Sequence, residues 1–375
     1  MTGAPAASRR PHDQRPVTAP VPIRTWNALS GHPRLSWSIL LHAQMRATPG
    51  LTQIERRLAT AWPPRLGSRP SVIGIEREEQ LHQLQGRFAD DSYDDRRPRV
   101  RVARSPASVL VAAHHSALDG LGLLGLLGIV LDAPVRSSVR GLSAEGGSPA
   151  AGRFLRRAAG RLREAALSPP LRIAPDRRGA GGGDHLVETQ VPSVTGGTPT
   201  LLAAVARAVD AWNDAHGTKS GPVTIAVGLS RRPGSTPTLE DESAFARVVM
   251  TGRTPDAARS ALHAAPPEPA APPGSRALGL VARLGRPLSG RLGSTLLVSN
   301  LGRIDVPDEV RSIAFWPVAT ARSGVSLGVT SVGAGTVLGL RARRAFFTRT
   351  GAERLLATIA ASLTPLSASP EATDA

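Results

Sequence analysis

Cysteine is absent from all 375 residues of the chain. Without thiols the chain has no disulfide framework, no thiolate nucleophile and no Cys-ligated zinc or iron–sulfur site. The sequence also lacks a His-Glu-x-x-His metal motif, a P-loop and a dinucleotide-binding fingerprint. Any chemistry therefore has to come from histidine, serine and carboxylate side chains, and we expect no metal site.

Long apolar runs are missing as well. The segment from Leu118 to Leu131 is interrupted by glycine and is shorter than the roughly 20 residues that a membrane-spanning helix needs. Arg9-Arg10 precedes a polar stretch rather than the apolar core of a secretory signal. We therefore expect a soluble, cytoplasmic protein without a membrane span, with a disordered leader over 1–22 and a disordered tail over 366–375.

Carboxylates and aromatic residues are scarce. The chain has 46 lysines and arginines against 29 acidic residues, a formal net charge of +17, and Lys219 is its single lysine. Scattered arginine of this kind attracts phosphates, so an arginine-rich nucleic-acid-binding protein is one candidate class. Aromatic residues make up only 3% of the chain, which leaves few surfaces for base stacking. We therefore favour a phosphate-bearing cofactor or an acidic carrier protein over nucleic acid.

The apolar content is sufficient for two subdomains. Hydrophobic residues make up 41% of the chain, and its length exceeds that of one ordinary core. Strand and helix patterns alternate in both halves, with an Arg-, Gly-, Ser- and Pro-rich stretch between them. We expect an N-terminal subdomain over 23–165, a crossover over 166–199 and a C-terminal subdomain over 200–365. The Pro-rich stretch 253–273 predicts a long mobile loop.

The segment His114-His115-Ser116-Ala117-Leu118-Asp119-Gly120 is the strongest motif. The apolar run 108–113 before it predicts a buried central strand, and the leucine-rich run after Asp119 predicts a helix capped by this aspartate. A neutral imidazole at such a junction can take a proton from an attacking hydroxyl or amine, because its ordinary pKa of about 6.5 is near the working pH. On this reasoning either histidine could be the base.

Asp119 and Gly120 fit the same chemistry. Asp119 can fix the junction through a buried ion pair with an arginine, or it can accept the imidazole N–H directly. Gly120 has no Cβ, so substrate could pass close to the backbone there. Each residue alone would be an ordinary buried histidine, helix cap or turn glycine. Their combination after a buried strand is what favours a catalytic site.

This motif resembles the signature of the chloramphenicol-acetyltransferase-like superfamily, which includes nonribosomal-peptide condensation domains, polyketide-associated acyltransferases, wax-ester synthases and plant-type alcohol acyltransferases. Weaker matches occur in the family's order at 26–31, 170–175 and 298–302. The resemblance implies an α/β fold of the α+β sandwich type. Two similar subdomains would form a V-shaped pseudo-dimer with a central tunnel.

The resemblance also assigns roles to the motif residues. The second histidine of the family's motif is the general base, which corresponds to His115 here. Asp119 would be structural or orienting, His114 secondary, and Gly120 a point of access to the tunnel.

Three further sets of residues complete the predicted site. The family's arginine partner for the aspartate comes from the first subdomain, for which Arg65 or Arg69 is a candidate. A negative charge developing on the carbonyl oxygen needs a hydrogen-bond donor, and the polar candidates near strand ends are Ser299, Asn300, Ser323 and Ser326. The basic segment 150–167 is either a solvated face or a docking site for coenzyme A or an acidic carrier helix, through Arg153, Arg156, Arg157 and Arg161.

The resemblance thus implies a free-standing, condensation-domain-like acyltransferase of secondary metabolism or lipid biosynthesis. It would move an acyl group from acyl-CoA or a phosphopantetheinyl carrier protein to a small-molecule alcohol or amine, as a monomer without a tightly bound cofactor. The Asp-Phe-Gly-Trp-Gly motif of plant acyltransferases is absent, as are later motifs of elongating condensation domains, which leaves the donor and the acceptor open. A catalytically silent relative that binds a carrier protein remains a competing class.

Overall fold

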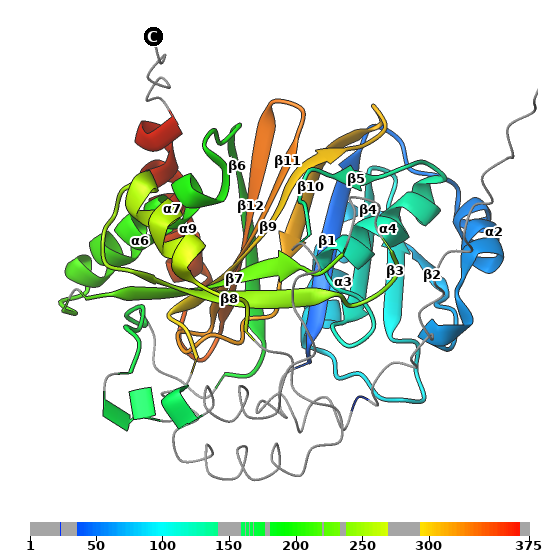
Figure 1. Ribbon diagram of the computed structural model, residues 1–375. Coiled ribbons are helices and arrows are strands. Elements are labelled where there is room, and N and C mark those ends of the chain that lie inside the picture. Colours follow the sequence, from blue (N-terminus) through cyan, green and yellow to red (C-terminus); the bar gives the residue numbers. More distant parts are fainter. Residues whose placement is uncertain are drawn as a thin grey trace, which may run out of the picture.

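The computed structural model contains two mixed α/β halves, each built on its own β-sheet (Figure 1). It describes Ile23 and residues 36–141, parts of 159–167, 169–176, 181–219, 221–232, 238–268 and 293–367. The predicted leader over 1–22, most of the predicted tail, the segment 26–31, and Arg153, Arg156 and Arg157 lie outside these residues. Within the described part of the chain, no helix is long and apolar enough to cross a membrane.

The first sheet has the strand order β10-β1-β4-β3-β2. Its strands are β1 (Ser38–Met45), β2 (Val72–Gly74), β3 (Val100–Arg104), β4 (Ser108–His114) and β10 (Val310–Trp316). Helices α2 (Leu51–Ala61) and α4 (Gly120–Leu131) share a core with one face, and α3 (Glu78–Asp90) packs on the other. A short 3-10 turn, Pro64–Leu66, follows α2. Because both faces are covered, β4 is buried along its whole length, as its apolar sequence predicts.

The second sheet has the strand order β6-β12-β11-β9-β7-β8. Its strands are β6 (Asp184–Pro192), β7 (Val223–Ser230), β8 (Ser243–Met250), β9 (Leu296–Asp305), β11 (Val325–Val332) and β12 (Gly335–Arg343), with the short β5 (Arg136–Ser137) paired to the end of β9. Helices α6 (Gly197–Ala215), α7 (Pro255–Ala264) and α9 (Arg349–Ser367) complete its core.

Helix α7 corrects one expectation. It lies in the stretch 253–273, which the proline content predicted to be a long loop. Thr254 caps the helix by accepting a hydrogen bond from the Ala257 N–H at 3.2 Å, and Pro255 occupies the first helical turn, where its missing N–H costs nothing. Proline here starts a helix instead of preventing one.

The two halves exchange strands. β10 comes from the second half of the chain but pairs with β1 of the first sheet. It also packs closely on β11 and β12, where Gly328 and Gly339 lie opposite each other. A Cβ on Gly328 would lie 2.0 Å from the Phe315 carbonyl oxygen, so only glycine permits this approach. The predicted crossover 166–199 contains β6 of the second sheet. Because β5 pairs with β9 and β10 pairs with β1, no single cut in the chain separates the two sheets.

Candidate active site

His115 lies directly after β4, at the junction between the two halves. Its backbone N–H donates to the Trp37 carbonyl oxygen at 2.9 Å, which continues the β1–β4 pairing by one residue. The side chain is 14% exposed and lines a cavity of about 140 Å³. Both halves line this cavity, through β1 and α4 on one side and β7, β8 and β9 on the other. The end of β4 thus presents an imidazole to a cavity between the two halves.

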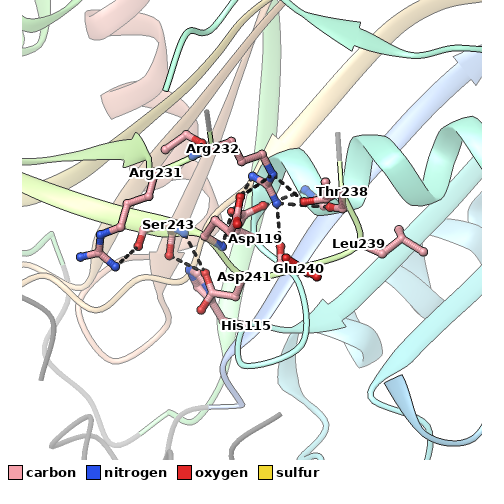
Figure 2. Close-up of polar contacts among 12 residues, drawn as sticks. His115, Asp119, Arg231, Arg232, Thr238, Leu239, Glu240, Asp241 and Ser243 are labelled. Carbon is pink, nitrogen blue, oxygen red and sulfur yellow. Dashed lines mark hydrogen bonds and ion pairs between the residues drawn. The ribbon is translucent and has the colours of Figure 1, made fainter. Parts of the chain in front are cut away.

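Asp241 faces His115 from the second half (Figure 2). Its Oδ2 atom lies 3.7 Å from the Nδ1 atom of His115. The other oxygen, Oδ1, accepts hydrogen bonds from the N–H and the hydroxyl of Ser243, at 3.1 and 2.6 Å. Burial raises the pKa of the Asp241 carboxyl above its ordinary value, although a charge on His115 acts in the opposite direction. Nothing in the sequence singled out this aspartate, because it lies far along the chain from the motif.

Asp119 is held by three hydrogen bonds at the start of α4. Its Oδ1 accepts from the Gly122 N–H at 2.7 Å, which is the predicted helix cap. Its Oδ2 accepts from Arg232 at 2.7 Å and from the Glu242 N–H at 3.0 Å. The side chains of Asp119 and Arg232 are 5% and 2% exposed, so this is a buried ion pair.

The arginine partner expected from the first subdomain was therefore assigned wrongly. The partner is Arg232, which follows β7 in the second half. Arg65 donates instead to the Leu239 carbonyl oxygen at 2.7 Å and pairs with the Glu240 carboxylate, while Arg69 is exposed. The pairing joins residues more than a hundred positions apart, and no local pattern in the sequence reports it.

Arg232 also organises the acidic segment, residues 238–242, which carries Asp241 (Figure 2). Its guanidinium donates to the Thr238 hydroxyl at 3.0 Å and to the carbonyl oxygens of Thr238 and Glu240 at 3.2 and 2.7 Å. Arg65 holds the same segment from the first half. Two arginines and Asp119 thus fix the backbone from which Asp241 reaches His115.

His114 points to a different environment. It is fully buried, it contacts the Ser116 hydroxyl through Nδ1 at 2.7 Å, and its ring lies edge-on to Tyr93. Burial, together with His115 and Arg99, lowers the pKa of His114 to about 3. The ring is therefore neutral at ordinary pH, and His114 is not among the described residues that line the cavity.

The candidates for stabilising the oxyanion divide into two pairs. Ser299 and Asn300, on β9, line the cavity with His115. The Asn300 carboxamide is oriented by Thr198 at 3.3 Å and by the Gly302 N–H at 2.9 Å. Ser323 accepts from the Ile173 N–H at 2.9 Å, and Ser326 donates to the Pro317 carbonyl oxygen at 2.8 Å. Neither of these two serines lines the cavity.

Two other predicted site residues, Gly120 and Arg161, contact other parts of the protein. Gly120 lines the cavity, and a Cβ there would meet the side chains of Leu301 and Phe315 at 2.8 and 3.0 Å. Arg161 pairs with Glu164 at 3.2 Å and with Glu268.

Within the part of the chain that the structure covers, no group of three or more His, Asp or Glu residues could hold a metal ion.

Comparison with solved structures shows the fold of condensation domains. The starter condensation domain of rhizomide synthetase, solved with C8-CoA and Leu-SNAC, is similar with a TM-score of 0.58 and 14% identity, over 92% of each chain. The EpoB cyclization-docking bidomain from Sorangium cellulosum has a TM-score of 0.57 at 12% identity, over 96% of this chain and 88% of that one. The epimerization domain from the third module of tyrocidine synthetase B has a TM-score of 0.52 at 12% identity, over 92% and 95%.

No protein-family model and no curated protein matches the sequence. The three solved domains are members of the superfamily that the His-His-x-x-x-Asp-Gly segment resembles, so the predicted fold is confirmed. At these identities the likeness establishes the fold and leaves the chemistry to be argued from the site.

Proposed function

We propose that the protein is an acyltransferase that moves an acyl group from a coenzyme A or phosphopantetheine thioester to the hydroxyl or amine of a small molecule. One observation carries the proposal: His115 lines the cavity between the two halves, and Asp241 from the other half faces its Nδ1 atom at 3.7 Å. A histidine that faces a largely buried carboxylate beside a cavity is an arrangement suited to general acid–base catalysis. The condensation-domain fold supports the same reaction class.

His115 is the general base in this mechanism. As the acceptor oxygen or nitrogen attacks the thioester carbonyl, the imidazole takes the acceptor's proton, and a C–O or C–N bond forms. The tetrahedral intermediate then collapses, the C–S bond breaks, and the imidazolium returns the proton to the thiolate. No bond forms between the acyl group and the protein in this mechanism, since none of the described residues that line the cavity is a cysteine or a serine paired with His115.

Asp241 and Ser299 assist this step. Asp241 faces Nδ1 of His115, so it favours the tautomer that carries its proton there and leaves the lone pair on Nε2. Its negative charge also stabilises the imidazolium that forms during the reaction. Ser299 lines the same cavity with a hydroxyl that can donate to the developing oxyanion.

Replacing the base tests the proposal. His115→Ala should lower turnover by about 10²–10⁴-fold, the usual contribution of a positioned acid–base group, with little change in melting temperature. Released thiol can be measured with a thiol reagent across a panel of acyl-CoA thioesters, alcohols and amines, because the chain has no cysteine of its own. His263→Ala, at an exposed position on α7, is the control. Equal turnover of His115→Ala and the parent would show that His115 is not the base.

A further inference from the structure

A second cavity, of about 1330 Å³, lies beside the site described above. Its lining residues come from elements in the upper part of Figure 1, among them β5 and the loop between β11 and β12. Four arginines from different parts of the chain line it, and we call it the arginine cleft. They are Arg46 after β1, Arg136 on β5, Arg303 on β9 and Arg311 on β10.

The arginines of the cleft are available to a ligand. All four are exposed, and none donates a hydrogen bond or forms an ion pair through its side chain within the described part of the chain. The two arginines that are buried among the described residues, Arg232 and Arg341, are both paired with aspartates. Of the described residues that line the cleft, two are carboxylates, Asp305 and Asp308. Exposed guanidinium groups like these can donate hydrogen bonds to the oxygens of phosphate groups.

The rest of the cleft suits a nucleotide. Val306 and Val332 provide partly exposed apolar surface, and residues 333 and 334 of the β11–β12 turn are exposed. Small-molecule sites measure about 300–1,000 Å³, so a hollow of about 1330 Å³ has room for a nucleotide. Clustered guanidinium groups beside apolar side chains therefore favour a polyphosphate ligand with an apolar part.

The arginine cleft and the His115 cavity share strands. Strands β9 and β10 and the segment around β5 contribute residues to both hollows. The His115 cavity is lined by Leu301, Phe315 and Val139. The arginine cleft is lined by Arg303, Arg311 and Ser138. From Asn300 in the cavity to Ile304 in the cleft, four residue steps correspond to about 13 Å of strand. A pantetheine arm has about as many chain bonds as four to five residues, so it extends over about 15 Å.

We infer that the arginine cleft binds the 3′-phosphoadenosine diphosphate end of coenzyme A, with the pantetheine arm following β9 to the His115 cavity. The inference rests on the proposed function and selects coenzyme A, rather than a carrier protein, as the donor. The phosphates lie among the guanidinium groups, and the thioester reaches the imidazole.

Charge reversal in the cleft tests the inference. The double variant Arg303→Glu/Arg311→Glu should weaken the binding of coenzyme A to the full chain by about 10- to 100-fold in calorimetry, because charge-assisted contacts to phosphate are lost. The variant should also lose a preference for coenzyme A over dephospho-coenzyme A. Arg56→Glu/Arg87→Glu makes the same charge change at exposed arginines on α2 and α3 and should bind as the parent does.

Several outcomes would overturn the inference. One is equal affinity of all variants for coenzyme A. A second is that ADP or inorganic phosphate binds as tightly as coenzyme A, which would show an unselective anion site. A third is that only Arg153→Glu/Arg156→Glu weakens binding, which would place the ligand on the basic segment.

Binding measured without an acceptor separates this inference from the proposed function. If coenzyme A binds in the cleft of the parent but no panel substrate is acylated, the inference is supported and the proposed function fails. If acyl-CoA is turned over with an unchanged KM in Arg303→Glu/Arg311→Glu, the proposed function stands and the inference is wrong.

Discussion

Asp241 is fixed by Ser243 before any substrate is present, and it faces the imidazole across 3.7 Å. This separation is too long for a hydrogen bond, but a movement of less than 1 Å would close it. Catalytic contacts of this kind commonly tighten when substrate binds. Burial raises the pKa of Asp241, so keeping its carboxylate charged at neutral pH costs stability. A role in catalysis therefore explains Asp241 better than a contribution to stability does.

Asp241→Asn should separate function from stability. Turnover should fall by about 10- to 10³-fold, because the negative charge that stabilises the imidazolium formed during the reaction is gone. The raised pKa of Asp241 favours the folded state at low pH, and this contribution is lost as the pH rises through that pKa. The variant should therefore melt higher than the parent at pH 8, with the two converging in acid. Full activity of Asp241→Asn would exclude a positioning role.

At the scale of the elements, Asp119 and Arg232 join the first turn of α4 to the end of β7 and to the acidic segment. The pair is buried, and each partner compensates for the hydration that the other has lost. The sequence predicted that Asp119 caps a helix, since a cap depends on residues three positions apart. It did not identify Arg232, because the pairing depends on how the two halves pack.

Asp119→Ala should destabilise the fold by about 3–5 kcal/mol, because it leaves the Arg232 charge buried without its partner. Urea denaturation measures this loss, and activity should fall with the folded fraction. Adding Arg232→Met should recover part of the stability, since the unmatched charge is then removed. If Asp119→Ala kept its melting temperature but lost activity as completely as His115→Ala, the aspartate would orient the imidazole directly.

At the scale of the whole molecule, two buried histidines couple folding to pH. Burial and the neighbouring His82 lower the pKa of His42 to about 4, and burial with His115 and Arg99 lowers that of His114 to about 3. The ordinary value is 6.5. The unfolded chain therefore binds protons that the folded chain does not, and stability present above pH 6.5 is lost as the pH falls toward these lowered values.

The melting temperature of the parent should fall between pH 7 and pH 5. Each histidine can contribute up to about 1.4 kcal/mol per pH unit in this range, and Asp241 acts in the opposite direction. The informative comparison is therefore between variants. His42→Gln should make the melting temperature depend less on pH, whereas His263→Gln, at an exposed site, should leave the pH dependence unchanged. Parallel melting curves for the parent and His42→Gln would contradict this account.

The sequence by itself determined the features that arise from neighbouring residues. These are the buried strand before His115, the Asp119 cap, the alternation of strands and helices in two halves, and the motif that named the fold. Apolar periodicity and capping act over a few residues, so they can be read from the chain. The change in composition along the chain predicts where the halves divide, but it does not report that β5 and β10 each pair with the sheet of the other half.

Only the tertiary structure decided what the two halves do together. It brought Asp241 to His115, gave Asp119 its partner in Arg232, moved β10 into the first sheet and gathered four arginines into one cleft. Each of these results joins residues that lie far apart in the chain and have no local signature. Their contacts follow from how two sheets pack against each other, which no short stretch of sequence encodes.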